Sequence, residues 1–219
     1  MVPYQPRIAC QLHIKVVAIL FLVFCLYGCD LLSINNEALP YYNSQNLTPT
    51  WDSNKKHKIA NFNLVDQTGK NFNTDSLKGK IYVANFFFTT CPSICPKMTK
   101  HFKLLQDSIS AMQHVEIVSF TVMPWVDTVN KLQAYGEENN IDPVKWHLLT
   151  GDKSKIYALG RASFFADNNK LSDTSTFIHT DKMYLIDKQQ QIRGVYNATN
   201  MNDIVRVLAD IKILEKTLE

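Results

Sequence analysis

Apolar residues follow two different spacings along the chain, and these spacings predict alternating strands and helices. Unbroken apolar runs, of the kind buried on both faces of a sheet, and shorter apolar segments predict strands. These strands cover residues 81–88, 115–122, 146–149, 183–187 and 192–196. Apolar positions three or four residues apart predict helices. These helices cover residues 96–112, 127–139, 154–161 and 202–218.

A β-hairpin is predicted ahead of this alternating region. Residues 61–65 and 71–72 flank a turn that contains Gly69. The order of hairpin, alternating strands and helices, a strand pair and a final helix is typical of an α/β protein. We expect a mixed central sheet flanked by helices, with right-handed crossovers, in the thioredoxin-like arrangement. In such folds the functional residues lie at the carboxyl ends of the strands.

The N-terminus has the features of an export signal. After Lys15, residues 16–27 form an unbroken apolar run. As a helix this run would span about 18 Å, too little for a bilayer core of about 30 Å, so it fits the hydrophobic region of a signal peptide. Residues 26–29 (Leu-Tyr-Gly-Cys) resemble a bacterial lipobox, with Cys29 as the lipidated first residue. The alternative is a short membrane anchor that is not cleaved.

This interpretation predicts a protein of the cell envelope, lipid-anchored to a membrane and facing the periplasm. Residues 1–28 would be a lipoprotein signal peptide, residues 29–57 a flexible tether rich in Asn, Ser, Thr, Pro and Tyr, and residues 58–219 the folded domain. The pattern leaves open whether Tyr41, Tyr42 or Trp51 docks locally. We expect the protein to be mostly monomeric.

Composition limits the classes of partner. The 219 residues are 46% apolar, which suits one globular domain with an ordinary core. Of the 23 Lys and Arg residues, Arg7 and Lys15 leave with the signal peptide, so 21 remain against 20 Asp and Glu. With a net charge of +1 and no basic stripe along the chain, nucleic acid is not an expected partner.

Cysteine usage points to one site. Cys10 and Cys25 lie in the predicted signal peptide and Cys29 is the predicted lipidation site, so only Cys91 and Cys95 remain in the folded domain. An exported compartment favours disulfides, so this pair must be oxidised or be protected by a metal or a reductant.

The position of this pair suits metal or redox chemistry. Cys91 directly follows the strand at 81–88, and Pro96 suits a first helical turn. Cys95 therefore lies at or beside the helix N-cap, where the helix dipole favours a thiolate. Two thiolates with the imidazole of His179 form a soft donor set that suits Cu(I) better than a four-ligand structural zinc site. The alternatives are a structural disulfide or inert thiols, and an ordinary loop histidine.

The residues around the pair resemble a known motif. Residues 86–98 (Phe-Phe-Phe-Thr-Thr-Cys-Pro-Ser-Ile-Cys-Pro-Lys-Met) strongly resemble the copper-site motif of the SCO/SenC family of copper chaperones. His179, followed by the segments 183–187 and 192–194, matches the third ligand of that family and its strand-turn-strand setting. The resemblance covers roughly residues 59–215.

This resemblance implies a site and a function. The family implies a thioredoxin fold that binds Cu(I) or Cu(II) through Cys91, Cys95 and His179. It also implies a role in delivering copper to a copper-accepting subunit of cytochrome c oxidase. We expect the ion to be transferred by ligand exchange onto a partner's cysteines. On this interpretation the protein is a metallochaperone and not an enzyme with turnover.

One departure from the family pattern lies after the second long strand. The family usually carries Asp-Pro-x-x-Asp-Thr, and residues 123–128 read Met-Pro-Trp-Val-Asp-Thr. Asp127 keeps the second acid, whereas Met123 replaces the first. The thioether of Met123 would favour Cu(I) if it lay near the site; the alternative is a packed loop methionine.

Two other functions use the same cysteines. In a thiol–disulfide oxidoreductase, Cys91 and Cys95 would cycle between dithiol and disulfide and keep a partner's copper-ligand cysteines reduced. The three-residue spacing and the lack of proline in residues 175–184 weigh against a general reductase. A peroxidase of the thioredoxin superfamily is disfavoured because Phe88 replaces the usual threonine.

Overall fold

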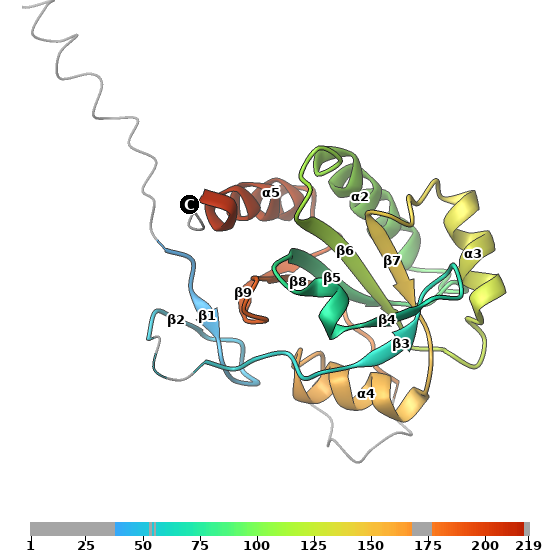
Figure 1. The fold of residues 1–219 in the computed structure, drawn as a ribbon, viewed down its shortest axis with the longest axis horizontal. Helices are drawn as coiled ribbons and strands as arrows, with labels where there is room; N and C mark the ends of the chain where they lie inside the picture. The colour runs from blue at the N-terminus through green and yellow to red at the C-terminus, as the bar shows by residue number, and fades with distance from the viewer. Residues whose placement is uncertain (1–37, 53, 55, 168–176, 217–219) are drawn as a thin grey trace, which may run out of the picture. The chain divides into compact units, whose positions relative to one another are not determined.

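The computed structural model describes residues 38–52, 54, 56–167 and 177–216. A five-stranded mixed sheet in the order β7-β6-β5-β8-β9 forms its centre (Figure 1). The three parallel strands are β5 (Ile81–Phe87), β6 (Val115–Thr121) and β7 (Trp146–Leu149). The antiparallel strands are β8 (Lys182–Ile186) and β9 (Ile192–Asn197). All five predicted strands are confirmed within one or two residues.

The four predicted helices are also present. They are α2 (Cys95–Ser108), α3 (Val129–Glu138), α4 (Lys153–Ala162) and α5 (Met201–Lys216). Side-chain caps set two of the starts, because Thr128 accepts a hydrogen bond from the N–H of Lys131 and Asp152 accepts one from that of Lys155.

Helix α2 ends at Ser108 instead of the predicted residue 112. The hydroxyl groups of Ser108 and Ser110 donate to the carbonyl oxygens of Leu104 and Asp107, both at 2.8 Å. Such bonds compete with the helical backbone pattern, and residues 109–112 close as a turn, with the N–H of Met112 bonded to the carbonyl of Ile109 at 2.9 Å.

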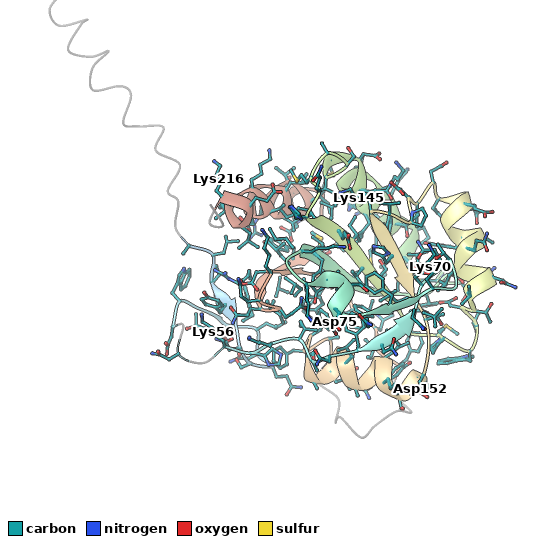
Figure 2. All side chains as sticks on the ribbon, in the orientation of Figure 1. Lys56, Lys70, Asp75, Lys145, Asp152 and Lys216 are labelled. Carbon is teal, nitrogen blue, oxygen red and sulfur yellow. The ribbon has the colours of Figure 1, made fainter. Side chains whose placement is uncertain are left out.

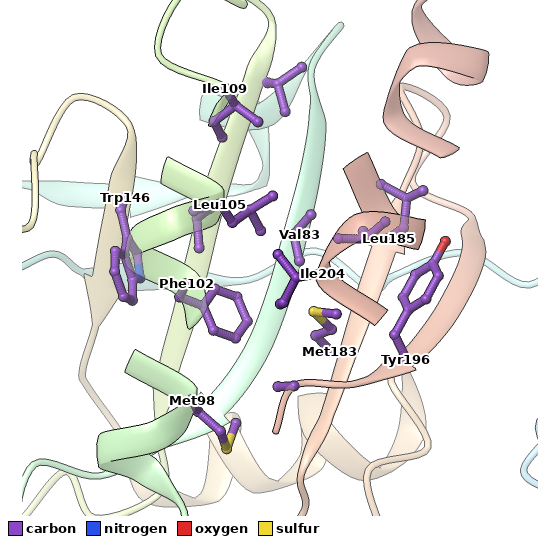
Figure 3. Close-up of a cluster of buried hydrophobic side chains, with 14 of the residues drawn as sticks. Val83, Met98, Phe102, Leu105, Ile109, Trp146, Met183, Leu185, Tyr196 and Ile204 are labelled. Carbon is purple, nitrogen blue, oxygen red and sulfur yellow. The ribbon is translucent and has the colours of Figure 1, made fainter. Parts of the chain in front are cut away.

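The sheet is covered on both faces, which explains why its central strand is a continuous apolar run. Val83 of β5 faces a core that α2, α5 and Leu132 of α3 complete, whereas Tyr82 and Ala84 face a second core completed by α4. Figure 3 shows Met98 and Phe102 of α2 packed toward the first core. Helices α2 and α5 accordingly lie on one side of the sheet and α4 on the other (Figure 1).

The predicted hairpin is confirmed as β3 (Asn63–Val65) and β4 (Asn71–Asn73). Its turn uses Gly69 in the left-handed region, at φ +81°, which glycine adopts without steric cost. Asp66 closes the turn by accepting a hydrogen bond from the N–H of Lys70 at 3.0 Å. Figure 2 labels Lys70, the last residue of this turn. A short 3-10 helix, η2 (Thr74–Leu77), leads from the hairpin toward β5.

The segment before the hairpin is packed onto the domain. It forms two short paired strands, β1 (Tyr41–Tyr42) and β2 (Pro49–Thr50). The Arg193 guanidinium of β9 lies 4.1 Å from the ring centroid of Tyr41 and donates to the carbonyl oxygen of Pro40 at 3.1 Å. It also donates to the carbonyl oxygen of Leu39, whose side chain is buried.

The compact unit therefore begins at Ala38 and not at residue 58, the boundary that composition suggested. Composition did not predict this docking because the segment has no periodic apolar face: it is held by backbone carbonyl groups, by the cation–π contact with Arg193 and by single side chains such as Leu39. The remainder of the predicted tether, residues 29–37, lies outside the described residues, as do the predicted signal peptide and Cys29.

Among the helices in the described part of the chain, none is both long and apolar enough to cross a membrane.

Candidate functional site

The two cysteines lie where β5 gives way to α2. Cys91 is in the connecting loop, and Cys95 is the first residue of α2 with Pro96 directly behind it. The predicted position at the carboxyl end of a central strand is confirmed. Both cysteines are free thiols, and both are buried, with 7% and 5% of their surfaces exposed.

The pKa values of the two thiols are shifted in opposite directions. Burial raises the pKa of Cys91, but the hydrogen bond from the Cys95 thiol and those from the backbone N–H groups of residues 93–95 outweigh burial and leave this pKa below its ordinary value. Burial raises the pKa of Cys95 to about 12, and the hydrogen bond that its thiol shares with Cys91 adds to the rise.

The helix N-terminus therefore activates Cys91 and not Cys95, in contrast to the sequence-based prediction. The first amides of a helix point away from its body, toward the residues that precede it. The N–H groups that act on the sulfur of Cys91 are those of Cys95, the first helical residue, and of Ser93 and Ile94 just before it.

A buried carboxylate fixes the loop that carries Cys91. Asp127 is fully buried and accepts hydrogen bonds from the hydroxyl of Thr89 at 2.5 Å and from its backbone N–H at 3.3 Å. The hydroxyl of Thr121, at the end of β6, also donates to Asp127. This carboxylate further raises the pKa of Cys95 through its charge. Asp127 is therefore a positioning residue for the cysteine loop.

The backbone of Met123 helps to place this carboxylate. Its carbonyl oxygen accepts hydrogen bonds from the N–H groups of Val126 and Asp127, both at 2.8 Å. Its own N–H donates to the hydroxyl of Thr121 at 3.0 Å. The residue that departs from the family pattern thus takes part, through its backbone, in the turn that presents Asp127.

Tyr135 of α3 is a site residue that sequence reasoning missed. Its hydroxyl shares a hydrogen bond of 2.6 Å with that of Thr99 on α2. Burial raises the pKa of Tyr135, and the charges of Cys95 and Asp127 raise it further. No signal in the sequence marks this position, because only the packing of α3 beside α2 brings its ring to the cysteines.

The buried thiols open onto a cleft between α2 and α3. This cleft has a volume of ≈ 260 Å³, and Cys91, Cys95, Tyr135 and Lys131 contribute to its walls. A small ion or the side chain of a partner therefore has a route to both sulfurs.

His179 lies on the loop next to the cysteine loop. Because Asn85 of β5 pairs with Met183 of the antiparallel β8, continuing this register places His179 beside the end of β5. Phe177 packs edge-on against Phe88, with ring centroids 5.2 Å apart, and so joins the two loops.

The structure does not gather the three predicted ligands. Cys91 and Cys95 line the same cleft and each shifts the pKa of the other, whereas the side chain of His179 is exposed. Within the described ranges, no group of three His, Cys, Asp or Glu side chains is close enough to hold a metal ion. Residues 168–176, which lead to His179, are outside these ranges.

Comparison with known sequences identifies the family. The SCO1/SenC family profile matches residues 51–214, so this chain belongs to that family. It is 31% identical to the "SCO1 protein homolog" of Bacillus subtilis, over 71% of this chain and 82% of that protein. It is also 31% identical to a "SCO2-like protein" of Rickettsia typhi, over 89% of this chain and 95% of that protein.

Solved structures agree with this assignment and with the thioredoxin-like fold. A SCO1/SenC family lipoprotein from Bacillus anthracis is similar with a TM-score of 0.65 and 31% identity, over 73% of this chain and 96% of that one. BsSco, described as a member of the Sco family of cytochrome c oxidase assembly proteins with a disulfide switch, has a TM-score of 0.65, 31% identity and coverage of 75% and 96%. The copper-bound ScoI of Bradyrhizobium japonicum has a TM-score of 0.58, 25% identity and coverage of 72% and 99%.

Proposed function

We propose that this protein is a copper-binding assembly factor that delivers copper to a respiratory oxidase, at a CuA-type site of cytochrome c oxidase. The observation that carries this proposal is the pair of free, buried thiols that open onto a cleft at the end of β5. The copper in the related ScoI structure and the oxidase-assembly role of the family to which BsSco belongs support it.

The donor chemistry of the site fits copper as cargo. Thiolates select Cu(I), and an imidazole binds either oxidation state of copper. The lowered pKa of Cys91 makes its thiolate easier to form than that of an ordinary cysteine, and an incoming cation would displace the proton of Cys95. The imidazole of His179 is exposed on the adjoining loop, so it would complete the site by moving toward the sulfurs.

Release of the ion then follows by ligand exchange. A site of two sulfurs and one nitrogen leaves room for a partner's thiolate to enter through the cleft between α2 and α3. Each sulfur that enters from the partner would replace one ligand of this chain. No net redox change is needed for this transfer.

A second function is favoured by the unequal acidities of the thiols. Cys91, with its lowered pKa, suits a nucleophile, and Cys95 suits a resolving thiol. The Cys91 thiolate would attack one sulfur of a partner's disulfide and release the other as a thiolate. Cys95, after losing its proton, would attack the Cys91 sulfur and release the second partner thiol, so that the partner is reduced and this pair oxidised.

We further propose that the protein is a monomer, held at the cell envelope by a lipid on Cys29, with the domain facing the periplasm. The relative from Bacillus anthracis is described as a lipoprotein. The mass of the mature protein tests this proposal: we expect a chain that starts at Cys29 and carries added acyl groups. A retained leader or an unmodified Cys29 would contradict it.

Copper titration of the reduced chain from residue 30 onward tests the main function. We expect one Cu(I) per chain, held against a chromogenic Cu(I) chelator, and loss of this binding in Cys95→Ala. Unchanged stoichiometry and affinity in Cys95→Ala would show that the site is misassigned. Fast reduction of a model disulfide that is undiminished in His179→Ala would favour the oxidoreductase instead.

A further inference from the structure

A groove lined by lysines extends from the cysteine pair along the junction of α2 and α3. The cleft at the sulfurs adjoins a second cleft of ≈ 550 Å³, and the two share Pro96, Glu138 and Asn139 as lining residues. The two clefts therefore lie next to each other along these residues, and we treat them as one groove. We call it the lysine groove after the four lysines that line it: Lys97, Lys100, Lys103 and Lys131.

The lysine groove is strongly positive for its size. Glu138 is the one acidic residue among its lining residues. Lys103 forms an ion pair of 2.5 Å with Asp107. Across the described ranges, no carboxylate lies within ion-pair distance of Lys97, Lys100 or Lys131.

The spacing of these lysines concentrates their charge. Lys97, Lys100 and Lys103 recur every third residue of α2, so they lie along one side of that helix. Lys131 comes from the first turn of α3, on the opposite wall next to the sulfurs. The whole chain has a formal charge of only +3, so this local excess is a property of the fold and not of the composition.

We propose that the lysine groove docks an acidic peptide segment of the protein whose cysteines meet Cys91 and Cys95. This inference rests on the proposed function, because it assumes that the pair exchanges copper or thiols with a partner. A positive groove would attract an acidic segment and orient it along α2, so that a partner cysteine arrives at the cleft.

A peptide fits the groove better than a single-stranded nucleic acid does. Binding of nucleic acid without sequence preference uses exposed aromatic rings on which bases stack. The aromatic side chain that lines the groove is Tyr135, which is half-buried and hydrogen-bonded to Thr99. The lysines therefore offer charge without a stacking surface.

The test measures the reaction of the reduced, metal-free protein with two activated peptides. Both carry one cysteine as a mixed disulfide with thionitrobenzoate; one has four glutamates beside it and the other four glutamines. The Cys91 thiolate attacks the peptide sulfur, a protein–peptide disulfide forms, and thionitrobenzoate leaves as a coloured thiolate. In about 0.01 M salt, where the Debye length is about 30 Å, we expect the glutamate peptide to react about 10-fold faster.

Two triple variants that remove the same charge test whether the lysine groove causes the difference in rate between the two peptides. We expect K97Q/K100Q/K131Q to bring the ratio of the two rates close to one. The ratio is the readout because a change in the reactivity of Cys91 itself alters both rates by the same factor. The variant K58Q/K70Q/K78Q removes the same charge from exposed lysines outside the groove, such as Lys70 at the β3–β4 hairpin (Figure 2), and should keep the ratio.

Three results would overturn the proposal. They are equal rates for the two peptides with the unmodified protein, an equal loss of the ratio in both triple variants, and inhibition by an octathymidylate stronger than that by an unreactive octaglutamate. Because no copper is present, a failure of copper binding would leave this measurement intact, so the two proposals can fail separately.

Discussion

Thr89 and Asp127 are joined by hydrogen bonds from both the hydroxyl and the backbone N–H of the threonine to one fully buried carboxylate. This contact ties the loop before Cys91 to the turn after β6. Asp127→Asn should loosen the loop, because an amide offers fewer acceptor positions to the hydroxyl groups of Thr89 and Thr121. We expect a loss of about 1–3 kcal/mol in the free energy of unfolding, measured by urea titration.

The same substitution should change the acidity of Cys95. The negative charge of Asp127 contributes to the raised pKa of Cys95, so its removal should lower that pKa. The measurement is the pH dependence of Cys95 alkylation. Asp107→Asn is the control, because this exposed acid on α2 pairs with Lys103. A pKa of Cys95 that is the same in both variants would contradict the assignment.

The two thiols should react at different pH values. Between the lowered pKa of Cys91 and that of Cys95, about 12, alkylation should modify Cys91 first, since the thiolate is the nucleophile. Peptide mass spectrometry after brief treatment with iodoacetamide reports the order. Preferential modification of Cys95 would reverse the roles of nucleophile and resolving thiol.

The Cys95 thiol is itself part of the reason for this order. Cys95→Ala removes the hydrogen bond that its thiol donates to Cys91, so the pKa of Cys91 should rise. Ser93→Ala is the matched control, because Ser93 contributes only its backbone N–H. Equal alkylation profiles for the two variants would show that the amides alone set the acidity of Cys91.

Because of Glu116, the free energy of unfolding should depend on pH in the acid range. Its carboxylate lies 2.5 Å from Lys80 Nζ and 3.2 Å from His147 Nε2. Burial raises its pKa, but His147 and Lys80 outweigh burial and hold the pKa below 4.5. For a carboxyl group with a depressed folded pKa, the stabilisation is present above the unfolded pKa and is lost as the pH falls through the folded value.

Glu116→Gln measures this contribution. We expect the variant to be less stable by about 1–3 kcal/mol near neutral pH, and the difference to shrink as the pH falls below 4.5. Asp75→Asn serves as the control, since its exposed pair with Lys78 should matter little at any pH. A difference for Glu116→Gln that is independent of pH would contradict the role of the buried carboxylate.

The sequence predicted the elements whose burial pattern is regular, and it missed what depends on tertiary contacts. The strand Ile81–Phe87 is buried on both faces, so its apolar run marked it with an error of one residue. The activation of Cys91 depends on the direction of the N–H groups of residues 93–95, which no local pattern encodes. The docking of Tyr41 depends on Arg193, more than 100 residues away, and has no periodic signal.

The same contrast between local patterns and tertiary contacts applies to the residues of the site. The motif drew attention to Cys91 and Cys95, and the structure confirms their position at the end of β5. The prediction that His179 is the third ligand rests on its resemblance to the family pattern and stays a prediction, because its exposed side chain is not gathered with the sulfurs. Tyr135 could not be predicted as a site residue, because only the packing of α3 beside α2 brings it there.

X-ray absorption of the Cu(I)-loaded protein, compared with His179→Ala, tests the proposed copper site most directly. We expect two sulfur ligands and one nitrogen ligand in the unmodified protein, and loss of the nitrogen in the variant while both sulfurs remain. His101→Ala is the matched control, because that imidazole is bonded to the carbonyl of Ala198 at 2.8 Å and should leave the spectrum unchanged. A spectrum with no nitrogen ligand, or one that His179→Ala leaves unaltered, would contradict a site built from Cys91, Cys95 and His179.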